Sequence, residues 1–401
     1  MPGNRLEIAM YSGIVVRRDA VSWSVRHKLE VLRHLISLGA PITVTCFAQS
    51  IDEDLGPELV CCPSVAKLLG RPEFWTADLH IYEEGMYYEL FDSIHLVPEG
   101  RPVLAIEHNS TPVDLVDVPA ARAAVERSHR QRANLLAATH VACVSELNRD
   151  LARQAGVPEE RLSVLHLPPA IVPQGPVRAL GGRGRPVHLL YLGRFVRAKG
   201  AADMVELARR LLTGDGRFLV TMAGDPRFSD PELLGAAQRA ASELPGLEVV
   251  LAPDDAETAR LYERADVLVV PSYHEGYCVP VVEAYGFGRF VVAYAAGNLP
   301  AIMGGLGRTV PAGDVVAMES ALRQLATELG EPGESVLTDT GQLRWSAWRD
   351  ALAEHLAGYT AASFERRFLG LLRDLARASP AGWSGVHEAA LAFRLAQTDR
   401  A

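Results

Sequence analysis

The sequence is short of several features, and each shortage excludes a class of protein. It has five cysteines, no Cys-x-x-Cys pair and no long apolar run. A disulfide scaffold, a zinc site and a membrane-spanning helix are therefore not expected. Residues 1–16 also lack the long apolar core of a signal peptide. Together these features predict a cytoplasmic protein. The net charge of −9 argues against a general nucleic-acid binder, so we expect no nucleic-acid partner.

Lysine is scarce as well. Only three of the 40 basic residues are lysines, namely Lys28, Lys67 and Lys199. This composition suggests a coding bias toward arginine, as in a GC-rich genome. A lysine is therefore an uncommon choice in this chain, and one that stands beside a predicted phosphate site is informative.

Short apolar runs alternate with helical patterns along the whole chain. Leu6–Tyr11 and Ile42–Phe47 are predicted to be strands, and Ser22–Ser37 between them has apolar residues at helical spacing. Further strands are predicted at Leu79–Tyr82, Val103–Glu107, His140–Val144, Val187–Leu192, Phe218–Met222, Leu247–Leu251, Asp266–Val270 and Phe290–Ala293. The pattern predicts the α/β class, with βαβ units around parallel sheets.

The length of 401 residues favours two domains, and the sequence contains a candidate boundary. Residues 168–186 are dense in proline and glycine and have no periodicity. We expect a first domain over 1–172, a linker over 173–186 and a second domain over 187–374. A helix at about 375–401 is expected to return to the first domain. Two such halves imply a ligand-binding cleft.

The first candidate site follows the strand predicted over Val187–Leu192. Gly193 allows a tight turn, and the helix predicted over Ala201–Leu212 presents free N–H groups that suit an anion. Arg194 and Lys199 place two positive side chains near the helix start, where the helix dipole disfavours cations. An anion between them would resolve this conflict, and a diphosphate has a suitable charge and size. The alternative is a solvated loop with two surface cations.

The second candidate site is a pair of acids, Glu275 and Glu283, which follows the strand predicted over Asp266–Val270. Pro280 suits the first turn of a helix, so Glu283 is expected in that turn and Glu275 in the preceding loop. Both carboxylates should lie at the carboxyl end of the strand, where open α/β sheets bind ligands. A carboxylate can accept two hydrogen bonds from a diol. The loop backbone that could face a sugar or phosphate belongs to Gly276, Tyr277, Cys278 and Val279.

A purely structural alternative exists for the first acid. Ser272 and Glu275 match a capping box. Gly276 and Pro280 would break a helix that started there, so we favour the ligand-binding interpretation.

The two sites together resemble the retaining glycosyltransferases of the GT-B fold, family 4. That family has two glutamates with seven residues between them, here Glu275 and Glu283, and an upstream Gly-Arg…Lys-Gly segment, here residues 193–200. The resemblance covers most of the second half of the chain and extends weakly into the first. It implies two facing Rossmann-like doubly wound domains, the first on the acceptor side and the second binding the nucleotide sugar. It also implies a nucleoside diphosphate sugar donor, commonly with UDP, a small-molecule or glycan acceptor, and neither a cofactor nor a metal.

The resemblance gives individual residues a role. Arg194 and Lys199 would bind the donor diphosphate and stabilise it as the leaving group. Glu275 would contact the donor sugar, and Glu283 would hold the ribose hydroxyls. His108 matches a family histidine near the donor sugar, and its alternative is a satisfied histidine at a strand end.

Three positions extend or depart from the family pattern. Gly224 matches a strand-end glycine near the nucleotide base. Gly13 is the single glycine of the first loop, where the family has a pair near the phosphates. Cys278 stands where the family usually has glycine, and its side chain is expected to reshape the sugar pocket.

Other features have a plainer interpretation. Residues 83–85, Glu-Glu-Gly, follow a strand and are more readily interpreted as a solvated loop than as a cleft wall. The arginine-rich helix over Pro119–Ala137 is interpreted as a solvated face rather than an anion-binding one. Asp254 fits a helix cap better than a metal motif. Asp314 fits either a family turn or an ordinary polar turn.

The expected reaction moves a sugar from a nucleoside diphosphate to an acceptor hydroxyl, with retention of the anomeric configuration. An aminoglycoside-like natural product is one plausible acceptor. Alternatives are a GT-B epimerase, a phosphorylase with pyridoxal phosphate, and a non-catalytic sugar-nucleotide-binding protein. The sequence leaves the oligomeric state open.

Overall fold

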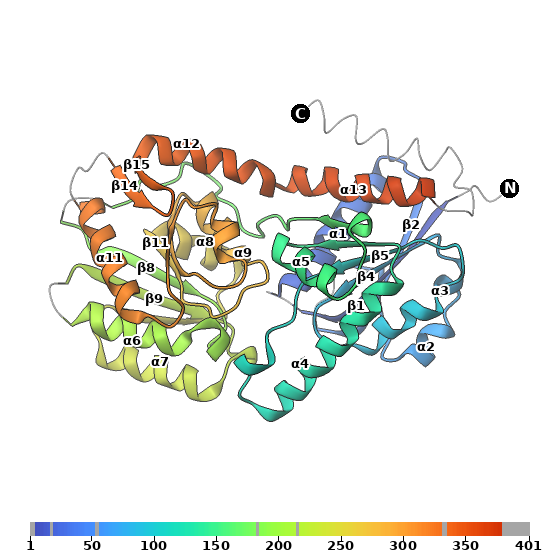
Figure 1. Ribbon diagram of the computed structural model, residues 1–401, viewed down its shortest axis with the longest axis horizontal. Helices are drawn as coiled ribbons and strands as arrows, with labels where there is room; N and C mark the ends of the chain where they lie inside the picture. The colour runs from blue at the N-terminus through green and yellow to red at the C-terminus, as the bar shows by residue number, and fades with distance from the viewer. Residues whose placement is uncertain are drawn as a thin grey trace. The chain divides into compact units, whose positions relative to one another are not determined.

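The computed structural model describes residues 5–16, 19–52, 56–181, 184–213, 216–330 and 335–378. Internal contacts divide the chain into two units (Figure 1). Unit 1 comprises residues 1–113, 118–167 and 361–401, and unit 2 comprises residues 114–117 and 168–360. Each unit has its own parallel sheet with helices, so the predicted α/β class is confirmed.

Unit 1 is built on a seven-stranded sheet with the order β3-β2-β1-β4-β5-β6-β7. The strands are β1 (Leu6–Val15), β2 (Ile42–Ile51), β3 (Leu59–Cys61), β4 (Leu79–Glu84), β5 (Val103–Glu107), β6 (His140–Cys143) and β7 (Leu162–Val164). In its core the ring of Tyr11 stacks on that of Tyr82, with centroids 4.2 Å apart. The strand order reverses between β1 and β4, and open α/β sheets bind ligands beyond the carboxyl ends of the strands at such a point.

Several helices of unit 1 begin at a side-chain cap. The main ones are α1 (Ala20–Ser37), α2 (Val65–Leu69), α3 (Pro72–Thr76), α4 (Pro119–Gln131), α5 (Glu146–Gln154) and α13 (Ala361–Ala378). The carboxylate of Asp19 accepts the N–H of Ser22 at the start of α1. Ser145 caps α5 by accepting the N–H of Asn148 at 3.2 Å.

Helix α13 belongs to unit 1 and packs against α1. The ring of Phe364 lies 4.8 Å from that of His27, and Phe368 is buried. The sequence pattern places residues up to 374 in the second domain, whereas in the structure the chain from Ala361 onward belongs to unit 1. The apolar face of α13 is the physical reason for the difference. Most of the helix predicted at about 375–401 lies outside the described residues.

Unit 2 has a six-stranded parallel sheet with the order β10-β9-β8-β11-β12-β13. The strands are β8 (Val187–Leu192), β9 (Phe218–Gly224), β10 (Leu247–Leu251), β11 (Val267–Val270), β12 (Phe290–Tyr294) and β13 (Arg308–Val310). The main helices are α6 (Ala201–Leu212), α7 (Pro231–Glu243), α8 (Asp255–Arg264), α9 (Val279–Gly286), α10 (Leu299–Met303), α11 (Val315–Gly330) and α12 (Trp345–Leu356). In Figure 1, α6 and α7 lie side by side along one face of this sheet. A separate hairpin consists of β14 (Ser335–Thr338) and β15 (Gly341–Arg344).

The described part of the predicted linker is anchored to unit 2. Arg178 and Arg185 contact the buried carboxylate of Asp266, at 3.1 Å and 2.6 Å. Asp266 immediately precedes β11, so the linker is fixed to the centre of the sheet of this unit.

Five predicted strands end too early, those of β1, β2, β4, β9 and β12, and the errors in β1 and β4 change the interpretation of candidate site residues. β1 continues through Gly13 to Val15, and it pairs with β2 as far as Ile51. Gly13 therefore lies in a strand and not in a loop. β4 continues through Glu84, which pairs with Glu107 of β5. The apolar pattern stops before the sheet does, because the strand ends carry polar residues that are nevertheless buried.

No helix in the described part of the chain is both long and apolar enough to cross a membrane.

Candidate active site

The two motifs of unit 2 meet in one ion pair. Lys199 ends the short 3-10 turn η5 (Arg197–Lys199), and its Nζ lies 2.7 Å from Oε2 of Glu275. The other carboxylate oxygen of Glu275 accepts a hydrogen bond from Ser272 Oγ at 2.8 Å. The side chain of Lys199 is 22% exposed and that of Glu275 is 9% exposed. The structure thus brings together a cation from the first predicted site and an acid from the second.

Glycines allow the backbone around this ion pair to approach closely. Gly200 has φ of +65°, and a Cβ there would lie 1.9 Å from the carbonyl oxygen of Pro271. A Cβ at Gly297 would lie 2.4 Å from the carbonyl oxygen of Glu275. A side chain at either position would push the loops apart. Gly200 therefore sets the distance between η5 and the loop that carries the acid, and Gly297 sets the distance between that loop and the turn after β12.

Gly193 and Gly224 make a similar approach at the ends of β8 and β9. A Cβ at Gly224 would lie 2.1 Å from the carbonyl oxygen of Gly193. The N–H of Gly193 donates to the carbonyl of Ala223 at 2.9 Å. Gly224 therefore has a packing reason that holds with or without a nucleotide, whereas a Cβ at Gly193 would make only ordinary contacts, the nearest at 3.5 Å.

Arg194 is the second cation of this region, and its side chain is exposed. Within the residues that the structure describes, no hydrogen bond or ion pair involves its guanidinium. Helix α6, which begins just downstream at Ala201, has no side-chain cap. An uncapped helix start and an unpaired arginine are both suited to an anion.

The loop between β11 and α9 holds the remaining predicted contacts of unit 2: Gly276, Tyr277, Cys278 and Val279. No helix starts at Ser272, and α9 begins at Val279 with Pro280 in its first turn, as the sequence suggested. Cys278 is buried and has φ of +80°, a left-handed conformation. This conformation costs a residue other than glycine about 1–2 kcal/mol. The glycine usual at this position in the family would avoid that strain.

Glu283 is already held by three protein donors. Its Oε1 accepts the N–H groups of Ala170 and Ile171, both at 3.2 Å, and its Oε2 accepts the hydroxyl of Tyr262 at 2.7 Å. A carboxylate has about four acceptor positions, so these contacts leave room for one further donor. Burial raises the pKa of Glu283 to about 7, although the three donors oppose this rise.

In unit 1, His108 follows β5 and takes part in a buried chain of polar groups. Its Nε2 lies 2.7 Å from Oε2 of Glu83, and Nζ of Lys28 on α1 lies 3.0 Å from Oε1 of Glu83. The side chains of Lys28 and Glu83 are 0% exposed and that of His108 is 4% exposed. Sequence reasoning missed Lys28, although the scarcity of lysine was a signal that could have found it.

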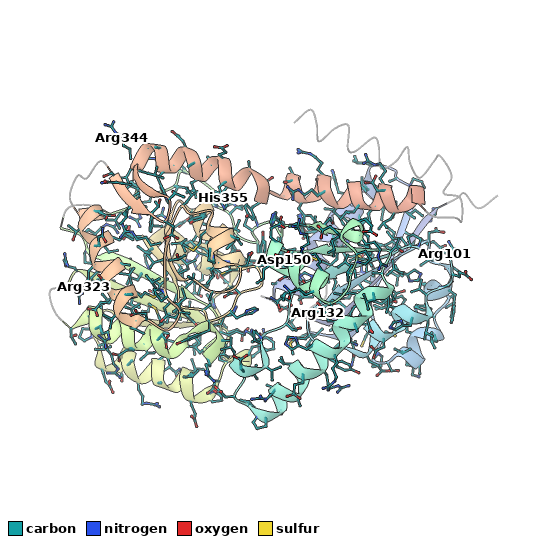
Figure 2. The ribbon with its side chains drawn as sticks, in the orientation of Figure 1. Arg101, Arg132, Asp150, Arg323, Arg344 and His355 are labelled. Carbon is teal, nitrogen blue, oxygen red and sulfur yellow. The ribbon has the colours of Figure 1, made fainter. Side chains whose placement is uncertain are left out.

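The opposite face of the same sheet edge carries a second buried group. Glu84 and Glu107 are register partners on β4 and β5, and Arg132 donates to Glu107 at 3.0 Å. Arg132, labelled in Figure 2, lies at the C-terminal end of α4. Burial, together with the charge of Glu107, raises the pKa of Glu84, and burial raises that of Glu107 to about 7. The interpretation of residues 83–85 as a solvated loop is therefore wrong, because both acids are buried strand residues.

The minor candidates have local structural roles. Asp254 caps α8 by accepting the N–H of Glu257, and Asp314 accepts the N–H of Ala317 at the start of α11. Gly13 faces Tyr88, whose Cβ would lie 3.0 Å from an added Cβ. The arginines of the arginine-rich segment are exposed, except Arg132, which is buried.

A separate hollow in unit 2 contains none of these residues. It lies between the linker, α9, α11 and α12, and side chains such as Leu329, Trp345 and Trp348 line it. It has no chemistry-bearing group of either motif, so we place the site at the Lys199–Glu275 pair instead.

Comparisons with known proteins bear on the same region. Residues 186–328 match the family described as glycosyl transferases group 1, and this range includes both motifs of unit 2. A D-inositol 3-phosphate glycosyltransferase of Geodermatophilus obscurus is 30% identical over 197 residues, which are 47% of this chain and 43% of that protein. A 2-deoxystreptamine N-acetyl-D-glucosaminyltransferase of Streptomyces fradiae is 31% identical over 217 residues, which are 52% of this chain and 48% of that protein. The chain thus spans less than half the length of these curated relatives.

Solved structures extend the likeness of fold to both units. A glycosyltransferase from Rickettsia africae matches with a TM-score of 0.66 at 15% identity, over 94% of this chain and 100% of that one. Sucrose-phosphate synthase from Thermosynechococcus elongatus matches with a TM-score of 0.66 at 19% identity, over the same shares. The chain therefore has the GT-B fold of glycosyltransferases. Its second unit carries the group 1 glycosyl transferase region, and the resemblance to family 4 is confirmed.

Proposed function

We propose that this chain is a retaining hexosyltransferase that uses a nucleoside diphosphate sugar, with UDP as the nucleotide. The observation that carries the proposal is the contact between Lys199 and Glu275 at 2.7 Å. A cation suited to a diphosphate and an acid suited to a sugar hydroxyl lie in one place, beside an uncapped helix start. A sugar linked to a diphosphate presents hydroxyl groups next to an anion, which matches an acid and a cation that lie side by side.

The proposed reaction breaks the bond between the anomeric carbon and the diphosphate oxygen and forms a bond from that carbon to the acceptor oxygen. The acceptor hydroxyl loses its proton to the departing phosphate, so charge and atoms balance. Negative charge grows on the diphosphate as it leaves. Lys199, Arg194 and the N–H groups at the start of α6 would stabilise that charge, and in many enzymes such electrostatic stabilisation contributes more to the rate than any other effect. Glu275 would hold a hydroxyl of the sugar.

The acceptor that we propose is a cyclitol. Inositol 3-phosphate and 2-deoxystreptamine, which appear in the names of the two relatives described above, are both six-membered carbocycles that carry hydroxyl groups. Their shared chemistry supports a small polyhydroxylated ring as the acceptor of this chain. It is also consistent with the aminoglycoside-like acceptor suggested by the sequence.

The test is a turnover assay with the full chain. UDP-glucose, UDP-N-acetylglucosamine and GDP-mannose are each incubated with 2-deoxystreptamine or inositol 3-phosphate, and products are identified by mass spectrometry and their anomeric configuration by NMR. We expect a disaccharide-like product with the α configuration of the donor. Lys199→Met should lower kcat by about 10²–10³, while Lys67→Met, which alters an exposed lysine, should leave it unchanged.

Several outcomes of this assay would contradict the proposal. Release of free sugar or of an epimer without an acceptor would point to an epimerase. Binding of the donors without turnover by any acceptor would point to a non-catalytic protein. Equal kcat values for the two lysine variants would remove Lys199 from the site.

A further inference from the structure

The buried chain Lys28–Glu83–His108 in unit 1 has a feature that a purely structural ion pair does not need. His108 uses Nε2 to contact Glu83, at 2.7 Å, and its Nδ1 is enclosed but has no hydrogen-bond partner among the described residues. Buried polar atoms without a partner are rare and costly in folded proteins. His108, which carries this Nδ1 atom, directly follows the carboxyl end of β5.

The surroundings of His108 decide which ring nitrogen carries its proton. Burial raises the pKa of Glu83, but the charge of Lys28 and the contact with His108 outweigh it, so the pKa is lowered and the group is a carboxylate. A carboxylate only accepts hydrogen bonds, so Nε2 of His108 must donate. Ser24 Oγ and Nζ of Lys28 donate to the same oxygen, at 3.2 Å and 3.3 Å, which fixes the carboxylate in place.

A neutral imidazole ring has a single proton, and the contact with Glu83 places that proton on Nε2. Lys28 and Glu83 are fully buried and cancel each other. A protonated His108 would add an unpaired charge to this group, which is expensive in a buried site. The neutral ring with its proton on Nε2 leaves Nδ1 as a lone-pair acceptor.

The backbone after His108 is also unusual. Asn109 has φ of +77°, a left-handed conformation that few residues other than glycine adopt. Arg132 lies 3.5 Å from its side-chain oxygen. Such conformations persist where the surroundings enforce them and are common at functional sites.

We propose that Lys28 and Glu83 are positioning residues, which hold His108 as the Nε2–H tautomer so that Nδ1 accepts a hydrogen bond from a hydroxyl group of the substrate. The inference rests on the proposed function for its substrate, a sugar or cyclitol hydroxyl. It adds two residues that neither motif contains. Lys28 acts only through Glu83, and Glu83 only through His108.

The decisive comparison is between two double variants. Lys28→Met/Glu83→Gln and Lys28→Met/Glu83→Met both remove the ion pair and keep the side-chain volume. Only the glutamine retains a carbonyl oxygen that can accept from Nε2 of His108. We expect the glutamine variant to keep kcat within about threefold of the unaltered chain, and the methionine variant to lose about 10–100-fold, because a misplaced contact costs about that much.

The tautomer can be measured without turnover. Two-dimensional 15N–1H NMR of histidine-labelled protein distinguishes Nε2–H from Nδ1–H, and His108→Gln identifies the signal among the 12 histidines. We expect Nε2–H in the unaltered chain and in the glutamine variant, and a mixture or Nδ1–H in the methionine variant. Thermal unfolding of both double variants checks that they are equally folded.

Each result decides a separate point. An Nδ1–H tautomer in the unaltered chain, or equal kcat values for two equally folded double variants, would overturn the positioning role. If the unaltered chain transfers no sugar, the proposed function fails while the tautomer measurement still decides the state of His108. If the methionine variant loses both activity and stability, kcat is measured again on its refolded fraction. A normal kcat in that fraction would show that Lys28 and Glu83 have only a structural role.

Discussion

The affinity of the chain for a UDP-sugar should fall as the pH falls below about 7, because Glu283 must be ionised to accept a ribose hydroxyl. The three donors around this acid fill most of its acceptor positions, and burial raises its pKa to about 7. Protonation turns one oxygen into a donor and removes the free acceptor position. The relevant perturbation is therefore a change of pH, with Glu283→Gln as the matched variant.

The magnitude follows from the pKa. With a pKa of about 7, Glu283 is roughly 90% ionised at pH 8 and roughly 10% ionised at pH 6, so the Kd should rise about tenfold between them. The effect of pH on folding stability has the opposite sign to its effect on affinity. The folded-state pKa lies above the ordinary value of 4.5, so the folded chain holds the extra proton between about pH 4.5 and 7. The associated stability is present below pH 4.5 and is lost as the pH rises through 7.

The assay is calorimetric titration with UDP-glucose at pH 6, 7 and 8. The diphosphate diester of this ligand does not titrate in that range, so a change of Kd with pH reports on the protein. A second ligand, 2′-deoxy-UDP-glucose, removes one ribose hydroxyl. We expect Glu283→Gln to abolish the pH dependence and to reduce the difference between the two ligands. A tenfold pH effect that survives in Glu283→Gln, or an unaltered chain with equal affinity at pH 6 and 8, would refute the reasoning.

Two further predictions concern backbone geometry. Gly200→Ala should lower the free energy of unfolding of unit 2 by about 2–4 kcal/mol, because the new Cβ meets the carbonyl of Pro271 and φ is positive. Gly286→Ala is the control and should be close to neutral, because a Cβ there meets nothing within 4 Å. Chemical denaturation of both variants checks this prediction, and equal midpoints would contradict it. Cys278→Val should lower the melting temperature, since a β-branched residue is strained at φ of +80°, while Cys278→Gly should keep or raise it. Calorimetric scans that rank valine above glycine at this position would show that the left-handed conformation is not the source of strain.

Much of the fold could be predicted because periodicity reports which faces are buried. Val103–Glu107, Val187–Leu192 and Ala201–Leu212 agree with the structure at both ends. The pattern fails where polar residues are buried inside regular structure, as at Glu84 in β4. It also misses β3, β7 and β13, which are three residues long and too short to show alternation.

The candidate site also has a part that the sequence could predict and a part that it could not. Lys199 and Glu275 could be related from the sequence because each follows a strand of the same sheet, β8 and β11, and these strands are neighbours. The contact of Lys28 with Glu83 could not, because it depends on how α1 lies on the sheet. Nor could the three donors to Glu283, two of which are backbone groups in a segment without periodicity.

The return of the chain to unit 1 through α13 has a consequence for synthesis. Residues 168–360 form nearly all of unit 2 and emerge from the ribosome before α13 does. Unit 2 can therefore begin to fold during translation, whereas α1 of unit 1 gains its packing partner α13 only later. Until α13 is made, α1 lacks the contact of His27 with Phe364, so this part of unit 1 completes its packing only after unit 2 has been synthesised.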